Sequence, residues 1–139
     1  MKKLITFCLL IILIIALYSC GKPKGLWDDN IHLATKTAVF SASGDSITIK
    51  TGGDGWWISD ISVDDKWYFN FTEVNVQVDR YTIQQDCFEV EHRDKNTLFI
   101  KVTANPKNVK RIVTVGLEAG DYFDRVTITQ KPKLSCFHQ

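Results

Sequence analysis

Short stretches in which apolar and polar residues alternate are the feature that most constrains the fold of this 139-residue chain. The alternation is clean at residues 46–50, 88–92 and 97–104, and it returns at 113–117 and 126–128. Successive side chains of a β-strand point to opposite faces, so each stretch predicts a strand with one buried face. No window carries an apolar stripe of helical period long enough to predict a helix.

Turn-forming residues separate the predicted strands. They occur at Ser43–Asp45, Gly52–Gly55, Asp64–Asp65, Asp94–Asn96, Asn105–Asn108 and Ala119–Asp121. Many short strands joined by frequent turns are typical of an all-β, antiparallel sandwich, here of about seven to nine strands. One segment breaks the pattern, because the apolar residues of 74–78 and those of 81–83 fall on opposite phases. The change near Asp79–Arg80 predicts a bulge, or a strand that crosses between the sheets.

An apolar run with a basic start opens the chain. Lys2 and Lys3 precede residues 4–17, in which Thr6 is the one clearly polar residue. About 14 residues are too few to span a bilayer as a helix, which takes roughly 20, so the run predicts a cleaved signal peptide. Removing residues 1–19 leaves 15 of the 17 basic residues against 16 acidic ones, a net charge of −1. This near-neutral balance argues against nucleic acid as a partner.

The sequence Leu17-Tyr18-Ser19-Cys20 resembles the lipobox of bacterial lipoproteins. By this resemblance residues 1–19 are a lipoprotein signal peptide and Cys20 carries acyl chains such as palmitate, more than one of which anchors a protein stably. Glycine and proline make residues 20–34 a predicted tether. An ordinary secretory peptide, or an uncleaved anchor, is the alternative. The expected location is the outer membrane, on its periplasmic face or at the cell surface.

Motifs in the second half of the chain resemble those of BACON domains. They are a strand, an Asn-containing turn, an Arg that opens the next strand and a last strand ending in Thr-Gln, at Leu98–Val102, Asn105, Lys110–Val115 and Asp124–Gln130. The first half of these domains is matched at Phe40, Gly44, Gly52–Gly53 and Trp56–Trp57. The resemblance covers residues 35–132, with a tail at 133–139. It implies an immunoglobulin-like sandwich of Bacteroidota envelope proteins that binds carbohydrate or mucin.

Six aromatic residues gather within residues 55–71: Trp56, Trp57, Trp67, Tyr68, Phe69 and Phe71. Exposed rings stack on the apolar faces of sugars, whereas rings between two sheets form core. Because Trp56 and Trp57 are adjacent, they lie on opposite faces of a strand, and one of them is expected outside the core. With Asp54 and Asp60 as partners for sugar hydroxyls, this pair is the candidate ligand site. The rings at positions 67, 69 and 71 share one face, which we assign to the core.

Metal binding and catalysis are weakly signalled. Asp60, Asp64 and Asp65 offer the carboxylate oxygens that calcium prefers, but they lack the spacing of a known calcium loop, so we expect no metal and no cofactor. Cys87 and His92 are the nearest pair suited to thiol catalysis. Five residues along a strand place them on opposite faces and about 16 Å apart. With no nucleophile, zinc or phosphate-binding motif elsewhere, we expect no enzyme.

Two covalent modifications stay open. A disulfide between Cys87 and Cys136 is permitted by an oxidising envelope, and two free thiols are the alternative. The tripeptide Asp45-Ser46-Ile47 resembles the acceptor motif for O-glycosylation in Bacteroidota, which makes Ser46 a candidate.

The sequence thus predicts a lipid-anchored, non-catalytic binding module of the bacterial envelope, with glycan as the leading ligand class. The alternative is a structural envelope lipoprotein that binds other proteins through exposed sheet edges and takes no sugar.

Overall fold

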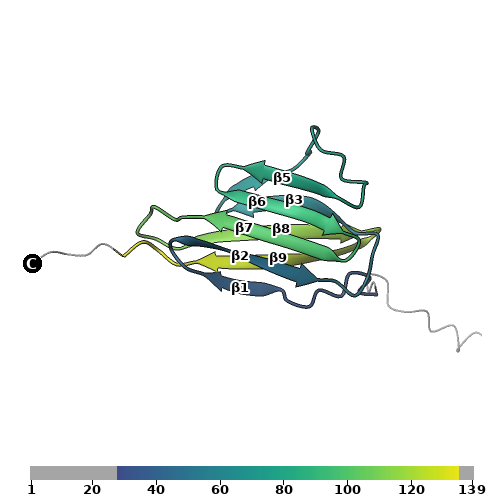
Figure 1. The fold of residues 1–139 in the computed structure, drawn as a ribbon, viewed down its shortest axis with the longest axis horizontal. Coiled ribbons are helices and arrows are strands. Elements are labelled where there is room, and N and C mark those ends of the chain that lie inside the picture. Colours follow the sequence, from purple (N-terminus) through teal and green to yellow (C-terminus); the bar gives the residue numbers. More distant parts are fainter. Residues whose placement is uncertain (1–27, 135–139) are drawn as a thin grey trace, which may run out of the picture.

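The computed structural model describes residues 28–134, and these form two stacked β-sheets with no helix (Figure 1). The strands are β1 (Thr37–Phe40), β2 (Gly44–Lys50), β3 (Trp57–Val63), β4 (Lys66–Tyr68), β5 (Tyr81–Gln85), β6 (Phe88–Asp94), β7 (Thr97–Thr103), β8 (Arg111–Ala119) and β9 (Tyr122–Gln130). Within residues 28–134 there is no helix long and apolar enough to cross a membrane. The prediction of an all-β chain is confirmed.

The strand order is that of an immunoglobulin-like sandwich. One sheet has five strands in the order β1-β9-β8-β3-β4, and the other has four in the order β2-β7-β6-β5. β1 runs parallel to β9, whereas the other neighbouring strands are antiparallel. In sequence order, β3, β8 and β9 take the places of immunoglobulin strands C, F and G, while β2, β6 and β7 take those of B, D and E. Figure 1 looks through both sheets, with β5 at the top and β1 at the bottom.

The core lies between the sheets and is made by the alternating apolar residues. Val113, Val115 and Leu117 of β8, with Val126 and Ile128 of β9, are completely buried. Each such side chain stabilises the fold by about 1.5 to 3 kcal/mol relative to its exposed state. The predicted inward phase of these two strands is therefore confirmed.

The folded domain begins before its predicted boundary at residue 35. Ile31 is completely buried in the core, and Leu33 forms a bridge to Thr51. A carboxylate oxygen of Asp29 accepts hydrogen bonds from the backbone N–H groups of Ile31 and His32, at 3.0 and 2.7 Å, and the bond from His32 is the main cause of the lowered pKa of Asp29. The prediction of a tether through residue 34 is wrong for these residues, because two apolar positions were too few to indicate a strand.

The segment between β4 and β5 carries the chain from one sheet to the other. β4 belongs to the five-stranded sheet and β5 to the four-stranded sheet, so residues 69–80 must cross between them. These residues form turns, not a strand. The change of apolar phase near Asp79–Arg80 thus reflects a crossing, as one of the two predictions had it, but a loop makes it and residues 74–78 are not a strand.

A buried polar network closes the end of the sandwich where β9 ends. Arg111 Nη1 donates to Gln130 Oε1 at 3.0 Å, and Gln130 Nε2 donates to the carbonyl oxygens of Thr103 and Ser41 at 2.9 and 3.2 Å. Asn105 Nδ2 donates to the backbone carbonyl oxygens of Val109, just before β8, and Lys131, just after β9. Arg111 and Gln130 of the predicted motif are therefore bonded to each other, while Asn105 binds other backbone groups at the same end of the sandwich.

A second bond ties the two sheets together near β5. The backbone N–H of Ile58 donates to the hydroxyl of Tyr81 at 2.8 Å, and burial raises the pKa of Tyr81 to about 12. Folding therefore disfavours the tyrosinate, so the contribution of Tyr81 to stability is complete below its ordinary pKa of 10.0 and is lost as the pH rises towards 12.

We expect Tyr81→Phe to lower the free energy of unfolding by about 1 to 3 kcal/mol at pH 7, because it leaves the buried N–H of Ile58 without its acceptor. The variant should also lose less stability than the parent between pH 10 and 12. Urea denaturation at a series of pH values measures both effects, with the exposed neighbour Thr82→Ala as control. Equal alkaline sensitivity of variant and parent would contradict the assignment.

Candidate functional site

The outer faces of the two sheets differ in chemistry. On the four-stranded sheet, charges of opposite sign lie together: Arg93 Nε is 2.6 Å from a carboxylate oxygen of Glu91, and Lys101 Nζ is 3.9 Å from one of Glu89. The guanidinium of Arg93 also lies 3.7 Å from the centre of the Phe99 ring, and covers it. This face is therefore largely self-paired and offers little bare apolar surface.

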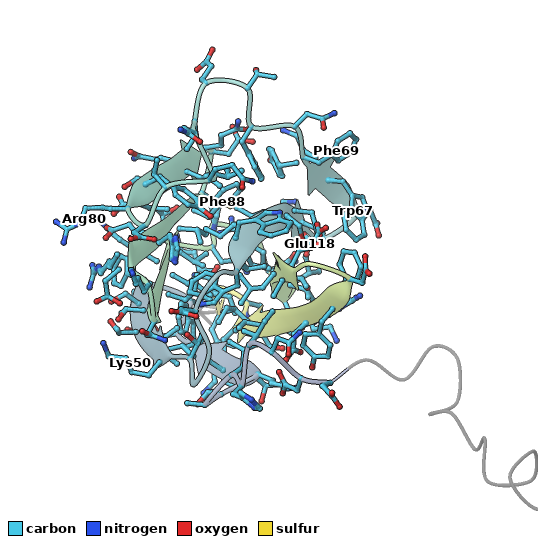
Figure 2. All side chains as sticks on the ribbon, turned by 90° about the vertical axis from the view of Figure 1, so that its right-hand side faces the viewer. Lys50, Trp67, Phe69, Arg80, Phe88 and Glu118 are labelled. Atoms are coloured by element: carbon cyan, nitrogen blue, oxygen red, sulfur yellow. The ribbon has the colours of Figure 1, made fainter. Side chains whose placement is uncertain are left out.

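The five-stranded sheet instead exposes aromatic side chains. Trp67 is 56% exposed, Phe69 62% and Phe123 63%. Figure 2 shows Trp67 and Phe69 on the same side of the molecule as Glu118, opposite Lys50 and Arg80. Large apolar side chains gathered on one exposed face are typical of an interaction surface.

The assignment of Trp67 and Phe69 to the core is wrong. β4 is an edge strand of three residues, and one of its faces looks away from the other sheet. Tyr68, of the opposite phase, turns inward instead: it is buried, and its ring meets the Phe88 ring edge-on at 5.1 Å. Phe71 lies beyond the strand and is half-buried against the core.

Trp56 and Trp57 do lie in different environments, as their adjacency predicts. Trp56 is 2% exposed, its Nε1 donates to the hydroxyl of Thr51 at 3.0 Å, and its ring packs 4.1 Å from the imidazole of His92. It cannot stack on a ligand, and its place in the candidate site is a wrong prediction. Trp57 is half-buried and pairs with Glu118 on the outer face of the five-stranded sheet.

A β-bulge in β3 points Asp60 towards the outer face. Ile58 pairs with Leu117 and Asp60 with Gly116, so Ser59 is an extra residue in β3. Ile58 and Ile61 are both buried although two residues separate them, which simple alternation does not allow. Asp60 is therefore turned outward, in contrast to Asp54, which is exposed in the turn before β3.

Asp60 lies in a hollow of about 140 Å³ on this face, which we call the face hollow. Its walls and floor include Trp67, Phe123, Thr114, Gly116, Asp60 and Arg125. Register places Trp67 on the edge strand and Phe123 three strands away, at opposite corners of the Asp60–Gly116 pair. A β-carbon at position 116 would collide with the Asp60 carboxylate, so glycine lets that carboxylate lie on the floor.

The face hollow combines apolar walls with a polar floor. The hydroxyl of Ser59 donates to Asp60 Oδ2 at 2.9 Å, and Asp60 keeps further acceptor capacity because a carboxylate can accept several hydrogen bonds. Arg125 supplies donors at the same place. The neighbouring charge of Asp124 is matched by Lys36, whose Nζ is 2.8 Å away and whose pKa is raised mainly by that contact.

The remaining predicted residues do not join this hollow. Ser46 is exposed on β2, and Cys87 is half-buried beside β6, where it forms no disulfide with another residue of the described part. Cys20 and Cys136 lie outside the described residues. His92 is buried, which lowers its pKa.

The described residues also give no metal-binding cluster. Within residues 28–134, no group of three or more His, Cys, Asp or Glu is placed to hold a metal ion. Asp64, one of the candidate calcium ligands, instead accepts the backbone N–H of Ile112 at 2.8 Å.

Comparison with known proteins supports the fold. No protein-family model and no curated protein matches this chain. The NMR structure of a protein from Bacteroides thetaiotaomicron is similar, with a TM-score of 0.64 and 21% sequence identity over 84% of this chain and 98% of that one. At this level of identity the likeness extends to the β-sandwich fold alone.

Proposed function

We propose that this protein is a lipid-anchored, non-catalytic module of the bacterial envelope that binds neutral glycans in the face hollow. The observation that carries the proposal is the pairing of exposed rings with a polar floor. Trp67 and Phe123 offer apolar faces for sugar C–H groups, while Asp60 and Arg125 offer an acceptor and a donor for hydroxyls. The other sheet offers no comparable combination in its outer face, because its charges are paired.

The expected affinity is modest. Apolar burial stabilises by about 25 cal/mol per Å², so covering about 100 Å² of ring surface contributes roughly 2.5 kcal/mol. Two or three hydrogen bonds add about 1 kcal/mol each. Because immobilising the ligand offsets much of this gain, we expect binding no tighter than the millimolar range, about −4 kcal/mol.

The proposed location in the envelope rests on the sequence. The signal-peptide pattern and the lipobox-like residues 17–20 support a lipid anchor at Cys20. The resemblance to BACON domains supports a glycan ligand, and three polar residues that carry part of it, Asn105, Arg111 and Gln130, lie at the same end of the sandwich.

We expect Gly116→Ala to lower the glycan affinity at least fivefold with little change in the melting temperature. The added β-carbon displaces the Asp60 carboxylate from the floor of the face hollow. Titration of the full chain in detergent with glycans selected on an array, beside thermal melts, measures both quantities.

Gly120→Ala is the matched control for this variant. Gly120 has a φ of 62° and open space around its β-position, so alanine there strains the backbone without touching the face hollow. It should lower stability and leave affinity unchanged. Equal affinity of Gly116→Ala and the parent would remove Asp60 from the site.

A protein partner is the second candidate, because tryptophan and other large rings also dominate protein interfaces. The observation in its favour is Val39, 67% exposed on the edge strand β1. If no glycan binds, and cross-linking from the outer face or the β1 edge of the five-stranded sheet captures an envelope protein, the protein's role is to bind that partner and not a glycan.

A further inference from the structure

A second hollow opens on the other side of Trp67, at the edge of the sandwich. It has a volume of about 410 Å³, within the range of roughly 300 to 1,000 Å³ that is usual for small-molecule sites. Trp67, Asn70, Phe71, Glu73, Ile83 and Gln84 are among the residues that line it. We call it the edge hollow.

The crossing segment between β4 and β5 shapes the edge hollow. Asn70, two residues after the end of β4, adopts a φ of 57°. The turn is closed by hydrogen bonds from Thr72 N–H to the Asn70 carbonyl at 2.7 Å and from Val74 N–H to the Phe71 carbonyl at 3.0 Å. Ile83 of β5 is buried and comes from the other sheet. The edge hollow therefore lies where the two sheets part at β4.

The lining of the edge hollow is suited to hydroxyl groups. Side-chain amides and hydroxyls, which both donate and accept, come from Asn70, Thr72, Gln84 and Gln85. Glu73 is the charged residue among those that line it, so an anionic ligand finds no cation there. The chemistry matches a neutral, hydroxyl-rich ligand with apolar faces, as in the face hollow.

Trp67 lines both hollows, so they adjoin at its ring. We propose that the face hollow and the edge hollow are successive subsites for one linear, neutral oligosaccharide that passes over β4 on the Trp67 ring. This inference rests on the proposed function and adds that the ligand is a chain of several sugar units. A unit held in one hollow raises the effective concentration of the next unit at the other, so affinity grows with chain length.

The test uses the full chain in detergent with ladders of neutral oligosaccharides, from one to six units, built from glucose, xylose, mannose or N-acetylglucosamine. Isothermal titration should show at least a tenfold rise in affinity between the monosaccharide and the tetramer of the ladder that binds. Gln84→Ala should lower the affinity for the tetramer at least fivefold. Gln77→Ala, an exposed glutamine in the crossing segment outside the edge hollow, should leave it unchanged.

Amide NMR shifts provide a second readout. The tetramer should perturb residues 59–60 and residues 70–73, one set in each hollow. Equal affinity for monosaccharide and tetramer, or an unchanged tetramer affinity in Gln84→Ala, would overturn the two-subsite inference and leave glycan binding in the face hollow standing. Absence of binding across all ladders would overturn both proposals.

Discussion

Trp67→Ala should abolish detectable glycan binding while the domain stays folded. The ring is the shared wall of the face hollow and the edge hollow, so its loss removes the apolar contact from both. We expect affinity to fall at least about 30-fold, or roughly 2 kcal/mol. Stability should change little, because 56% of the side chain is exposed and the core face of β4 belongs to Tyr68. Titration with the tightest-binding oligosaccharide and a thermal melt measure the two effects.

Val109→Ala is the control for Trp67→Ala. Val109 is 57% exposed, a degree similar to that of Trp67, but it precedes β8 and lines neither hollow. Its variant should keep the parent affinity. If Trp67→Ala binds as the parent does, or loses binding only together with its folded state, the ring is no part of a binding site.

Gln130→Ala should cost the fold about 3 kcal/mol of unfolding free energy. Gln130 is completely buried, and its side chain links Arg111 to the carbonyls of Thr103 and Ser41. Truncation removes one hydrogen-bond acceptor from the buried guanidinium of Arg111 and one donor from each of the two carbonyls. A buried polar group that loses its partner costs about 1 to 3 kcal/mol of unfolding free energy before the structure relaxes. Urea denaturation measures the loss.

The exposed glutamine Gln85 gives the matched control for Gln130→Ala. Gln85→Ala should shift the unfolding free energy by less than about 0.5 kcal/mol, as surface substitutions usually do. A loss below about 1 kcal/mol in Gln130→Ala would show that the network is not what holds this end of the sandwich together.

Alternation in the sequence was enough to predict the sandwich, because a period of two is a direct consequence of strand geometry. The same period tells which residues share a face, but not whether another sheet covers that face. The pattern therefore predicts Trp67 and Phe69 in the core, whereas they lie on the outer side of the five-stranded sheet, which no other sheet covers. Which of the two faces of a strand is covered depends on how the sheets stack, and the local pattern does not contain that information.

The face hollow was predicted only in part. Asp60 was a candidate, but its position beside Trp67 depends on the bulge at Ser59, and a bulge leaves little trace in a sequence. The sequence does carry one further signal of this site. Gly116 interrupts the apolar and polar alternation of β8, and a glycine inside a strand often marks a close approach. Here that approach is made by the Asp60 carboxylate.

The bulge in β3 has a genetic consequence. Without Ser59, the remaining residues would alternate regularly, with Ile58 and Ile61 still inward and Asp60 still outward. The inward-facing residues of β3 would therefore be the same without Ser59. What Ser59 adds is a local bend of the strand and a hydroxyl beside the Asp60 carboxylate. A single inserted codon is thus enough to add a bend and a hydroxyl beside Asp60 while the apolar face of β3 stays as it is.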